Sequence, residues 1–257
     1  MIVQIYEIQS REEAQLVVDL GVDHVGSVVL TPAHCQDPVL KDAVAAVKAG
    51  GRLSSLIPLF HDPECIAQAI RFYEPDIIHF CETLCANGNG HPQTLAALER
   101  QKNIRKAFPN IQIMRSIPIA QTGYGSEIPS LSLAAWFEPY SDWFLTDTLL
   151  MANRDTPEQD QPVSGFVGIT GQTCDWSVAR DLVQASRIPV ILAGGIGPAN
   201  ARQGIEQVKP AGVDSCTGTN ALDAAGNPIR FKKDPDKVRA LVLAARELAD
   251  HTQTDDR

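Results

Sequence analysis

Pro189-Val190-Ile191-Leu192-Ala193-Gly194-Gly195 is a short, continuously apolar run that ends in two glycines. Such a run is typical of a strand in a parallel sheet, where helices cover one face and a core fills the other. Similar short runs alternate with longer segments of helical periodicity, which is the signature of βαβ units. The predicted strands are 2–7, 24–30, 53–60, 76–81, 111–117, 142–147, 189–193 and 212–216, and the predicted helices are 11–20, 38–49, 63–73, 92–107, 129–138, 175–186, 198–208 and 234–249.

Consecutive βα units in this number favour a closed (β/α)8 TIM barrel over an open doubly wound sheet, which more often has about five to seven strands. No Gly-x-Gly-x-x-Gly follows the first strand, which disfavours a dinucleotide-binding fold. No linker or internal repeat divides the chain. We therefore expect a single barrel domain over residues 1–249 and a polar C-terminal tail over 250–257. Ser10 is predicted to cap the first helix, with Glu13 completing a capping box.

Composition limits the possible partners. The formal net charge of −9 over 257 residues argues against nucleic acid, whose phosphates demand a basic protein face. No apolar run approaches the roughly 18 residues of a membrane span, and the first residues show no secretory signal. The six cysteines form no Cys-x-x-Cys pair, which is typical of reduced thiols. These features predict a cytoplasmic protein, monomeric or homodimeric, with neither nucleic acid nor membrane as a partner.

Three glycine-rich segments follow predicted strands, at the end of a barrel where function is concentrated: 168–176, 193–196 and 216–219. Glycine lets backbone N–H groups approach an anion closely, and threonine hydroxyls add donors. The alternative is that these glycines only form tight βα turns, but three segments on one face favour a phosphate site. The predicted phosphate or substrate contacts are Thr170, Gly171, Gly194, Gly195, Thr217, Gly218 and Thr219.

The glycine-rich segments and several other stretches of the chain resemble a known family. The segment Gly168-x-Thr-Gly-x-Thr-x-Asp-Trp176, the run 189–195, Asn200, Gly212-Val-Asp214 and the lysines at 232–237 are similar to phosphoribosylanthranilate isomerase of tryptophan biosynthesis. Arg11-Glu12-Glu13-Ala14 and the stretch 20–26 also match its first βα unit. The resemblance implies a TIM barrel and an Amadori-type aldose–ketose isomerisation of a phosphorylated sugar, without a cofactor.

The same resemblance implies a general acid and a general base. Asp147 ends the sixth strand at the place of the family's acid, although an aspartate there could simply cap the following turn. The family's base is a cysteine that ends the first strand, and this chain has Tyr6 and Glu7 at that point. Tyrosine is a poor base because its reference pKa is near 10. Glu7 would need a twist at the strand end, because adjacent strand residues point to opposite faces.

Two further segments depart from the family pattern. After the second strand, this chain has Thr31-Pro32-Ala33-His34 in place of the family's Ser-Pro-Arg motif, whose arginine binds the anthranilate carboxylate. In the fourth strand, the residues are His79-Phe80-Cys81-Glu82. His34, His61, His79, Cys81 and Glu82 all lie near the ends of strands 2 to 4, which raises the hypothesis of a Zn²⁺ or related divalent site. The alternative is that they are packed or solvated polar residues.

Two other features carry predictions. Arg115, on the fifth strand, is predicted to meet a substrate oxygen, or to pair with Asp147 or Glu82 in a structural network. Residues 150–164 form a polar segment long enough to act as a lid.

The sequence leaves three functions open. The first is an isomerase acting on a phosphosugar, in which Asp147 is the acid and Glu7 or Tyr6 is the base. The second is a metal-assisted lyase, epimerase or hydrolase acting on a phosphorylated substrate. The third is a non-catalytic phosphosugar-binding protein.

Overall fold

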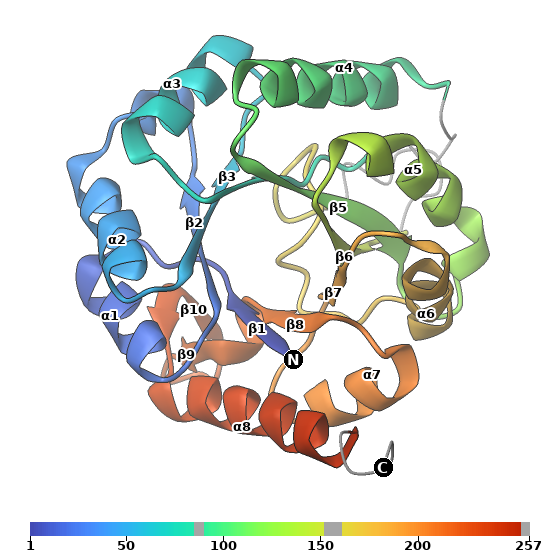
Figure 1. The fold of residues 1–257 in the computed structure, drawn as a ribbon. Coiled ribbons are helices and arrows are strands. Elements are labelled where there is room, and N and C mark those ends of the chain that lie inside the picture. Colours follow the sequence, from blue (N-terminus) through green and yellow to red (C-terminus); the bar gives the residue numbers. More distant parts are fainter. Residues whose placement is uncertain (85–89, 152–160, 253–257) are drawn as a thin grey trace.

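The chain folds into a closed barrel of eight parallel strands surrounded by helices (Figure 1). The computed structural model describes residues 1–84, 90–151 and 161–252. The barrel strands are β1 (Ile2–Ile5), β2 (His24–Val29), β3 (Leu53–Pro58), β4 (Ile77–Phe80), β5 (Gln112–Ala120), β6 (Trp143–Leu149), β7 (Val190–Leu192) and β8 (Gly212–Ser215). β1 pairs with both β2 and β8, so the sheet closes on itself. The predicted TIM barrel is confirmed.

Each predicted helix is present close to its expected position. The helices are α1 (Arg11–Asp19), α2 (Pro38–Ala49), α3 (Pro63–Tyr73), α4 (Pro92–Ala107), α5 (Ser130–Phe137), α6 (Trp176–Ala185), α7 (Ala201–Val208) and α8 (Pro235–Thr252). Several begin at an aspartate whose side chain accepts a backbone N–H: Asp37 caps α2, Asp62 caps α3 and Asp175 caps α6. α8 continues to Thr252, so the helix extends into the predicted tail; residues 253–257 lie outside the described residues.

One of the two capping contacts predicted for the first helix is present. Ser10 Oγ accepts the N–H of Glu13 at 3.2 Å. The Glu13 carboxylate does not complete the capping box, because it accepts the backbone N–H of Lys233 at 2.8 Å instead. Glu13 thereby ties the start of α1 to the segment before α8, and the two ends of the chain are held together.

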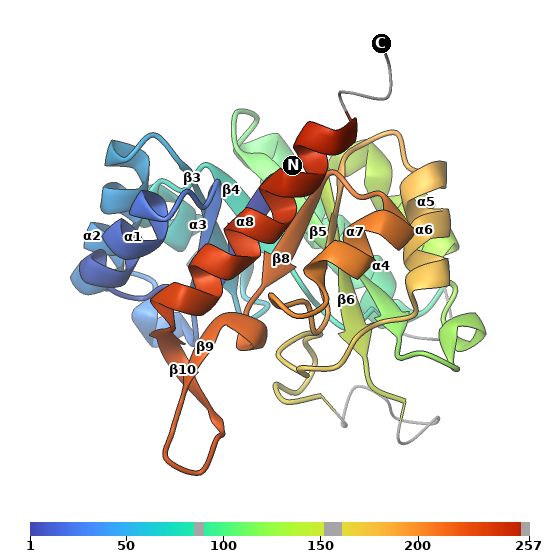
Figure 2. The same cartoon turned by 90° about the horizontal axis from the view of Figure 1, so that it is seen from below.

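A hairpin that the periodicity did not predict interrupts the last βα unit. β9 (Asn220–Leu222) and β10 (Pro228–Lys233) pair antiparallel between β8 and α8, after a short 3-10 turn, η5 (Thr217–Thr219). The other 3-10 turns are η1 (Pro32–His34), η2 (Gly125–Glu127) and η3 (Glu138–Tyr140). Figure 2 shows the hairpin projecting beyond the barrel, on the side away from the N-terminus. It therefore stands at the face formed by the C-terminal ends of the strands.

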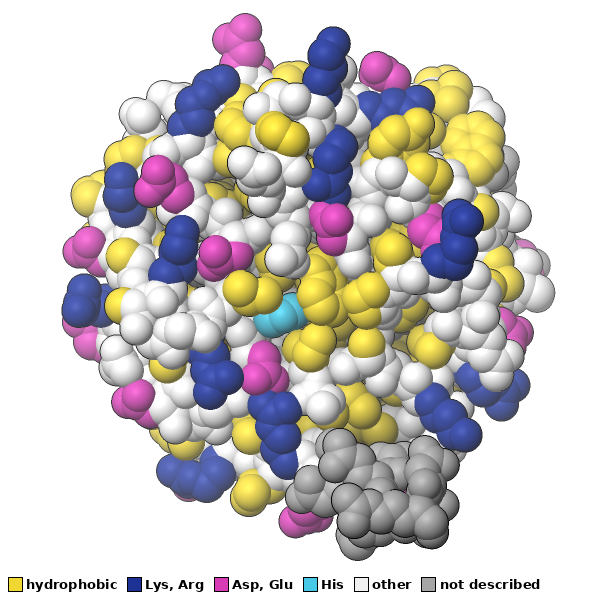
Figure 3. Space-filling model, in the orientation of Figure 1, with side chains coloured by type: hydrophobic (Ala, Val, Ile, Leu, Met, Phe, Trp, Pro, Cys, Tyr) yellow, Lys and Arg dark blue, Asp and Glu magenta, His cyan; other side chains and the backbone are white. Residues whose placement is uncertain are grey.

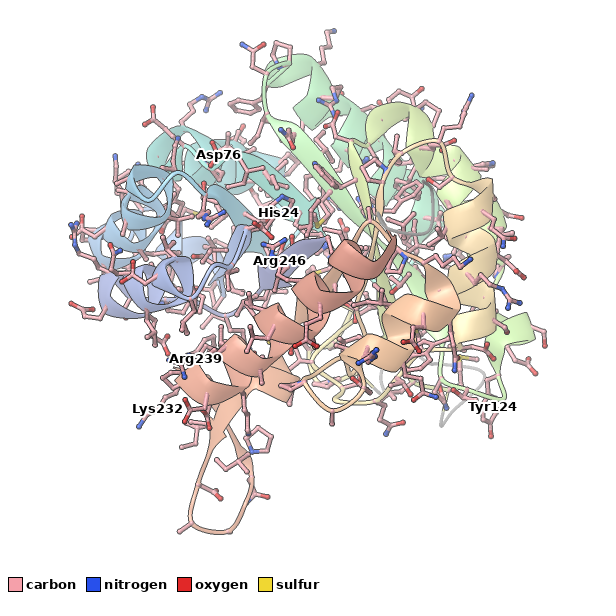
Figure 4. All side chains as sticks on the ribbon, turned by 60° about the horizontal axis from the view of Figure 1, so that its bottom comes forward. His24, Asp76, Tyr124, Lys232, Arg239 and Arg246 are labelled. Carbon is pink, nitrogen blue, oxygen red and sulfur yellow. The ribbon has the colours of Figure 1, made fainter. Side chains whose placement is uncertain are left out.

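The opposite face carries several ion pairs. Figure 3 views the molecule from that side, where hydrophobic side chains and a histidine lie at the centre and acidic and basic side chains surround them. Asp23 accepts the N–H of Val3 at 2.9 Å and pairs with Arg246 of α8 at 2.6 Å and with Arg52 at 3.2 Å. Figure 4 shows Arg246 close to His24 at the start of the barrel strands. These contacts join α8 to the first strands at the N-terminal end of the barrel.

Candidate active site

The barrel opens at the C-terminal ends of its strands into a pocket with about 710 Å³ of free space, part of it open to solvent. Strands β1 to β4 and β6 to β8, or the segments that follow them, contribute to it, and β5 is the exception. The pocket is lined by Tyr6, Glu7, Val28, Ile57, Leu59, His79, Cys81, Leu145, Asp147, Val167, Gly168, Ile169, Thr170, Gly171, Gly194, Gly195, Ile196, Asp214, Cys216, Thr217 and Gly218.

The three glycine-rich segments meet on one side of this pocket. Gly194 and Gly195 adopt left-handed backbone conformations, with φ of 82° and 61°. A Cβ at Gly195 would lie 2.5 Å from the carbonyl carbon of Gln172, and one at Gly218 would lie 2.5 Å from the oxygen of Ile196. The segments therefore pack backbone against backbone. Of the predicted phosphate contacts, Thr219 alone does not line the pocket: it is buried, and its hydroxyl donates to the carbonyl of Cys216 at 3.2 Å.

Replacing Gly195 with alanine tests the need for this close approach. The added methyl group would clash with the backbone of Gln172 and strain a left-handed residue, so the loop must shift. We expect the dissociation constant for inorganic phosphate, measured by calorimetry, to rise about tenfold or more. Gly51→Ala is the matched control, because Gly51 has φ of 69° and open space around its Cβ position. Equal phosphate binding by both variants would contradict this role of Gly195.

Asp147 of β6 stands at the floor of the same pocket. Its Oδ1 accepts the N–H of Thr148 at 3.0 Å, and a Cβ at Gly168 would lie 2.7 Å from its Oδ2. Enclosure of the carboxyl group raises its pKa to about 7, against which the Thr148 hydrogen bond acts weakly. A carboxyl group with this pKa is partly protonated at neutral pH and can both give and take a proton.

Glu7 reaches the pocket because the chain turns sharply after β1. Its φ is 68°, a left-handed value that breaks the strand's alternation and supplies the twist required by the sequence prediction. The side chain is 1% exposed, and its Oε1 accepts hydrogen bonds from Nε and Nη2 of Arg230 on β10, the former at 2.8 Å. Its Oε2 has no hydrogen-bond partner among the described residues. Glu7 therefore places one carboxyl oxygen beside the pocket, near the thiol of Cys216.

Tyr6 points into the barrel interior and is poorly suited to act as a base. Its hydroxyl lies 2.5 Å from Ser55 Oγ and 2.7 Å from His79 Nδ1, and His79 Nε2 lies 2.8 Å from Ser116 Oγ. Burial raises the pKa of Tyr6 well above 10 and lowers that of His79 to about 3. The four side chains therefore form a chain of hydrogen bonds between uncharged groups. The predicted role of Tyr6 as a base is disfavoured because its hydroxyl keeps its proton at neutral pH.

Asp214 is a pocket residue that the sequence analysis quoted but did not assign. It lies on β8 beside Gln4 of β1, whose side-chain amide donates to Oδ1 at 3.2 Å. Burial raises its pKa to about 8; the Gln4 hydrogen bond opposes this shift and the Asp147 charge adds to it. Asp214 therefore holds a proton at neutral pH. A carboxylate within the apolar run of a barrel strand was the signal that could have revealed it.

Arg115 does not enter the pocket, which corrects its predicted contact with substrate. It is fully buried on the outer side of β5, between the rings of Phe80 and Phe137. Its Nη1 pairs with Glu82 and its Nε donates to Gln101 at 2.8 Å. Strand alternation explains the error: the neighbouring Ser116 points inward to His79, so Arg115 must point outward. The alternative prediction, a structural network with Glu82, is what the structure shows.

The predicted metal ligands do not converge. His79 and Cys81 face the interior, whereas Glu82 faces outward to Arg115 and Arg100. His61 stacks on Phe166 with ring centroids 5.0 Å apart, outside the main pocket. His34 is exposed, and its Nδ1 lies 2.9 Å from Thr31 Oγ1. Across residues 1–84, 90–151 and 161–252, no group of three or more His, Cys, Asp or Glu could hold a metal ion.

The segment that directly follows the predicted lid lies against the residues at the end of β4. Val167 donates its N–H to the carbonyl of Cys81 at 2.8 Å, and Thr83 donates its N–H to Gly165 at 3.0 Å. Residues 152–160, which form most of the predicted lid, lie outside the described residues. Val167 and Ile169 close the pocket opposite the strands.

Comparison with known proteins agrees with this architecture. Residues 144–242 match the family model described as N-(5'-phosphoribosyl)anthranilate (PRA) isomerase. N-(5'-phosphoribosyl)anthranilate isomerase 2 of Methanosarcina mazei is 35% identical over 55% of this chain and 58% of its own length. Isomerase 1 of the same organism is 25% identical over 92% of this chain and 91% of its own length. The chain is thus similar to the phosphoribosylanthranilate isomerase family, and the family model matches it over residues 144–242.

Solved structures of the family share the whole barrel. That of phosphoribosylanthranilate isomerase from Thermotoga maritima has a TM-score of 0.66 and 19% identity, covering 96% of this chain and 100% of its own. The relatives with higher sequence identity match over a shorter length. The alignment spans 58% of the M. mazei isomerase 2 and 36% of a Haloferax volcanii isomerase that is 45% identical. Family likeness is thus concentrated in the segment that bears Asp147 and the glycine-rich loops.

No helix among the described residues is long and apolar enough to span a bilayer.

Proposed function

We propose that this protein catalyses an acid–base isomerisation of a phosphorylated aminosugar, converting a phosphoribosyl amine into the corresponding amino-deoxyribulose phosphate. The observation that carries the proposal is the placement of Asp147 and Glu7, two carboxyl groups of different character, in one pocket with the glycine-rich loops. Asp147 has a raised pKa and can donate a proton, whereas Glu7 is paired with Arg230. Such a division between two carboxyl groups supports acid and base roles.

The proposed reaction begins with two proton transfers and ends with a tautomerisation. Asp147 gives its proton to the ring oxygen of the sugar, the bond from that oxygen to C1 breaks, and the amine lone pair forms an iminium ion. Glu7 then removes the proton from C2, and the electron pair of that C–H bond neutralises the iminium nitrogen as an enolamine. The enolamine becomes the ketone when C1 takes up a proton and the C2 hydroxyl gives up its own. No oxidant or reductant is needed, because the oxidation at C2 is balanced by the reduction at C1.

The phosphate of the substrate is placed against Gly194, Gly195, Thr217 and Gly218. This placement is supported by the left-handed glycines and by the usual position of phosphate sites after strands 7 and 8 of such barrels. It orients the sugar across the pocket, between Asp147 on β6 and Glu7 after β1. Asp214 is protonated at neutral pH, so it can donate a hydrogen bond to a sugar hydroxyl without adding charge.

A related structure is consistent with this arrangement. A phosphoribosylanthranilate isomerase with a TM-score of 0.64 and 18% identity was solved with reduced 1-(o-carboxyphenylamino)-1-deoxyribulose 5-phosphate. That ligand combines a sugar phosphate with an arylamine.

The experiment is an assay of wild type and Glu7→Gln with a phosphoribosyl arylamine, following formation of the amino-deoxyribulose phosphate. We expect Glu7→Gln to lower kcat by about 10²- to 10⁴-fold, the usual contribution of a general base. Glu12→Gln is the matched control, because Glu12 is exposed on α1. Binding of the amine by wild type without any turnover would overturn the proposal and favour a phosphosugar-binding protein.

Arg230 provides an independent test of Glu7. Arg230→Gln removes the guanidinium whose Nε and Nη2 donate to Glu7 Oε1, so the carboxyl group loses its fixed position and kcat is expected to fall about tenfold or more. Arg230→Lys should restore part of the activity, and Lys232→Gln, on the exposed side of the same hairpin, should leave kcat unchanged (Figure 4). A wild-type kcat in Arg230→Gln would contradict the role of Glu7 as the base.

A further inference from the structure

The half of the pocket away from the glycine-rich loops is apolar. β2, β3 and the segment after the predicted lid supply Val28, Ile57, Leu59, Val167 and Ile169, which line the pocket together with Cys81 at the end of β4. Val28 and Ile57 are register partners on adjacent strands, so their side chains lie side by side. If the phosphate binds after β7 and β8, the group attached to the sugar nitrogen must lie against this surface.

The polar groups of this half are already satisfied by one another. The Tyr6 hydroxyl is shared between Ser55 and His79, and the far nitrogen of His79 is taken up by Ser116. His79 is neutral because its pKa is lowered to about 3 by burial. Cys81 offers only a thiol, a weak donor, and burial raises its pKa well above 9. None of these side chains has a strong donor left for an incoming anion.

The titratable side chains that line the pocket include three carboxyl groups, those of Glu7, Asp147 and Asp214, and no lysine or arginine is among the described lining residues. Two basic side chains that contact lining residues are already paired: Arg230 with Glu7, and Lys233 with the carbonyl of Cys216 at 2.9 Å and the Asn220 side chain at 2.6 Å. Among residues 1–84, 90–151 and 161–252, the lining offers a substrate carboxylate in this half no counter-charge, which is strongly unfavourable.

From these observations we infer that the amine half of the substrate is apolar and carries no carboxylate. The inference rests on the proposed function, since it assumes that the phosphate occupies the glycine-rich loops, and it names the class of the substrate: a phosphoribosyl derivative of an uncharged aromatic or aliphatic amine. Anthranilate, which bears a carboxylate beside its amine, is the less favoured aglycone.

Two stable analogues that differ only in the carboxylate test the inference. They are reduced 1-(o-carboxyphenylamino)-1-deoxyribulose 5-phosphate and the same compound with a plain phenylamino group. Calorimetry on the full chain is expected to show the carboxyl-free analogue binding about tenfold tighter or more, the factor expected for an unpaired buried charge. Tighter binding of the carboxylated analogue, or equal binding of the two, would overturn the inference.

A variant of the apolar surface provides the reverse experiment. Leu59→Arg places a cation beside the amine half, and it is expected to bind the carboxylated analogue more tightly than the plain one. Leu59→Met retains a long apolar side chain and should keep the wild-type preference. If Leu59→Arg keeps that preference too, the amine half does not lie against this surface and the inference fails.

Failure of the inference and failure of the proposed function give different results. If wild type binds ribose 5-phosphate and Gly195→Ala weakens that binding, the phosphate placement stands, and a preference for the carboxylated analogue overturns only the substrate class. If neither analogue binds and ribose 5-phosphate does not bind either, the phosphosugar pocket itself is refuted and the inference falls with it.

Discussion

Replacing Asp147 with asparagine is expected to lower kcat by about 10³-fold, while the dissociation constant of a substrate analogue changes little. The amide keeps the size of the carboxyl group and the contact with Gly168, but it has no acidic proton to give to the ring oxygen. Steady-state kinetics with a phosphoribosyl arylamine measures the loss of kcat, and calorimetry with the reduced analogue measures binding. A variant that retains more than a tenth of the wild-type kcat would remove Asp147 from the chemistry.

The pH dependence of wild type gives the same residue a second signature. The acid must be protonated, and its pKa is raised to about 7, so activity due to Asp147 is full below that pH and falls as pH rises through it. The residual activity of Asp147→Asn should not show this fall. The same raised pKa implies that folding stability is lost between the ordinary aspartate pKa, near 4, and about 7. Asp147→Asn, which stays neutral, should therefore gain stability over wild type as pH rises through that range.

The second large effect is on stability. Glu82→Gln is expected to lower the free energy of unfolding by about 3–5 kcal/mol, because it leaves the buried guanidinium of Arg115 without a counter-charge. Arg115 already has one side-chain nitrogen, Nη2, without a partner in the described structure. Urea unfolding followed by circular dichroism measures the loss.

Two comparisons separate a lost charge pair from a general packing defect. Arg100→Gln removes the second, less buried partner of Glu82 and should cost only about 1–2 kcal/mol. Arg115→Met in the Glu82→Gln background should recover much of the stability, because an apolar side chain replaces the unpaired charge between Phe80 and Phe137. If the double variant is no more stable than Glu82→Gln alone, the loss does not come from a stranded charge.

The sequence predicted the barrel well because its signals are local. Short apolar runs, such as 190–192, and helical segments follow the period of each element, and caps such as Asp62 mark where helices begin. Ser10 was predicted correctly as a cap for the same reason. The β9–β10 hairpin was missed because its strands are short and partly exposed, with no strong period.

The site was predicted less well because side-chain direction depends on the strand and on distant partners. Arg115 and Glu82 were assigned to the mouth by their nearness to strand ends, yet both point to the helix layer. Conversely, Glu7 reaches the pocket only through its left-handed backbone, and its partner Arg230 lies 223 residues away in sequence. The glycine-rich segments were easier to predict, since a backbone site needs no particular side-chain direction.

The Glu7–Arg230 pair has a consequence for building chimeric barrels. A closed barrel makes the first strand a neighbour of the last, so the two chain ends form one structural unit. A chimera with a single crossover in the middle of the sequence would take these two ends from different parents. A half-barrel exchange with a relative would give Glu7 a new C-terminal half and separate it from Arg230. Recombination that moves residues 1–13 and 212–235 as a single block would preserve the pair, together with the contact of Glu13 with Lys233.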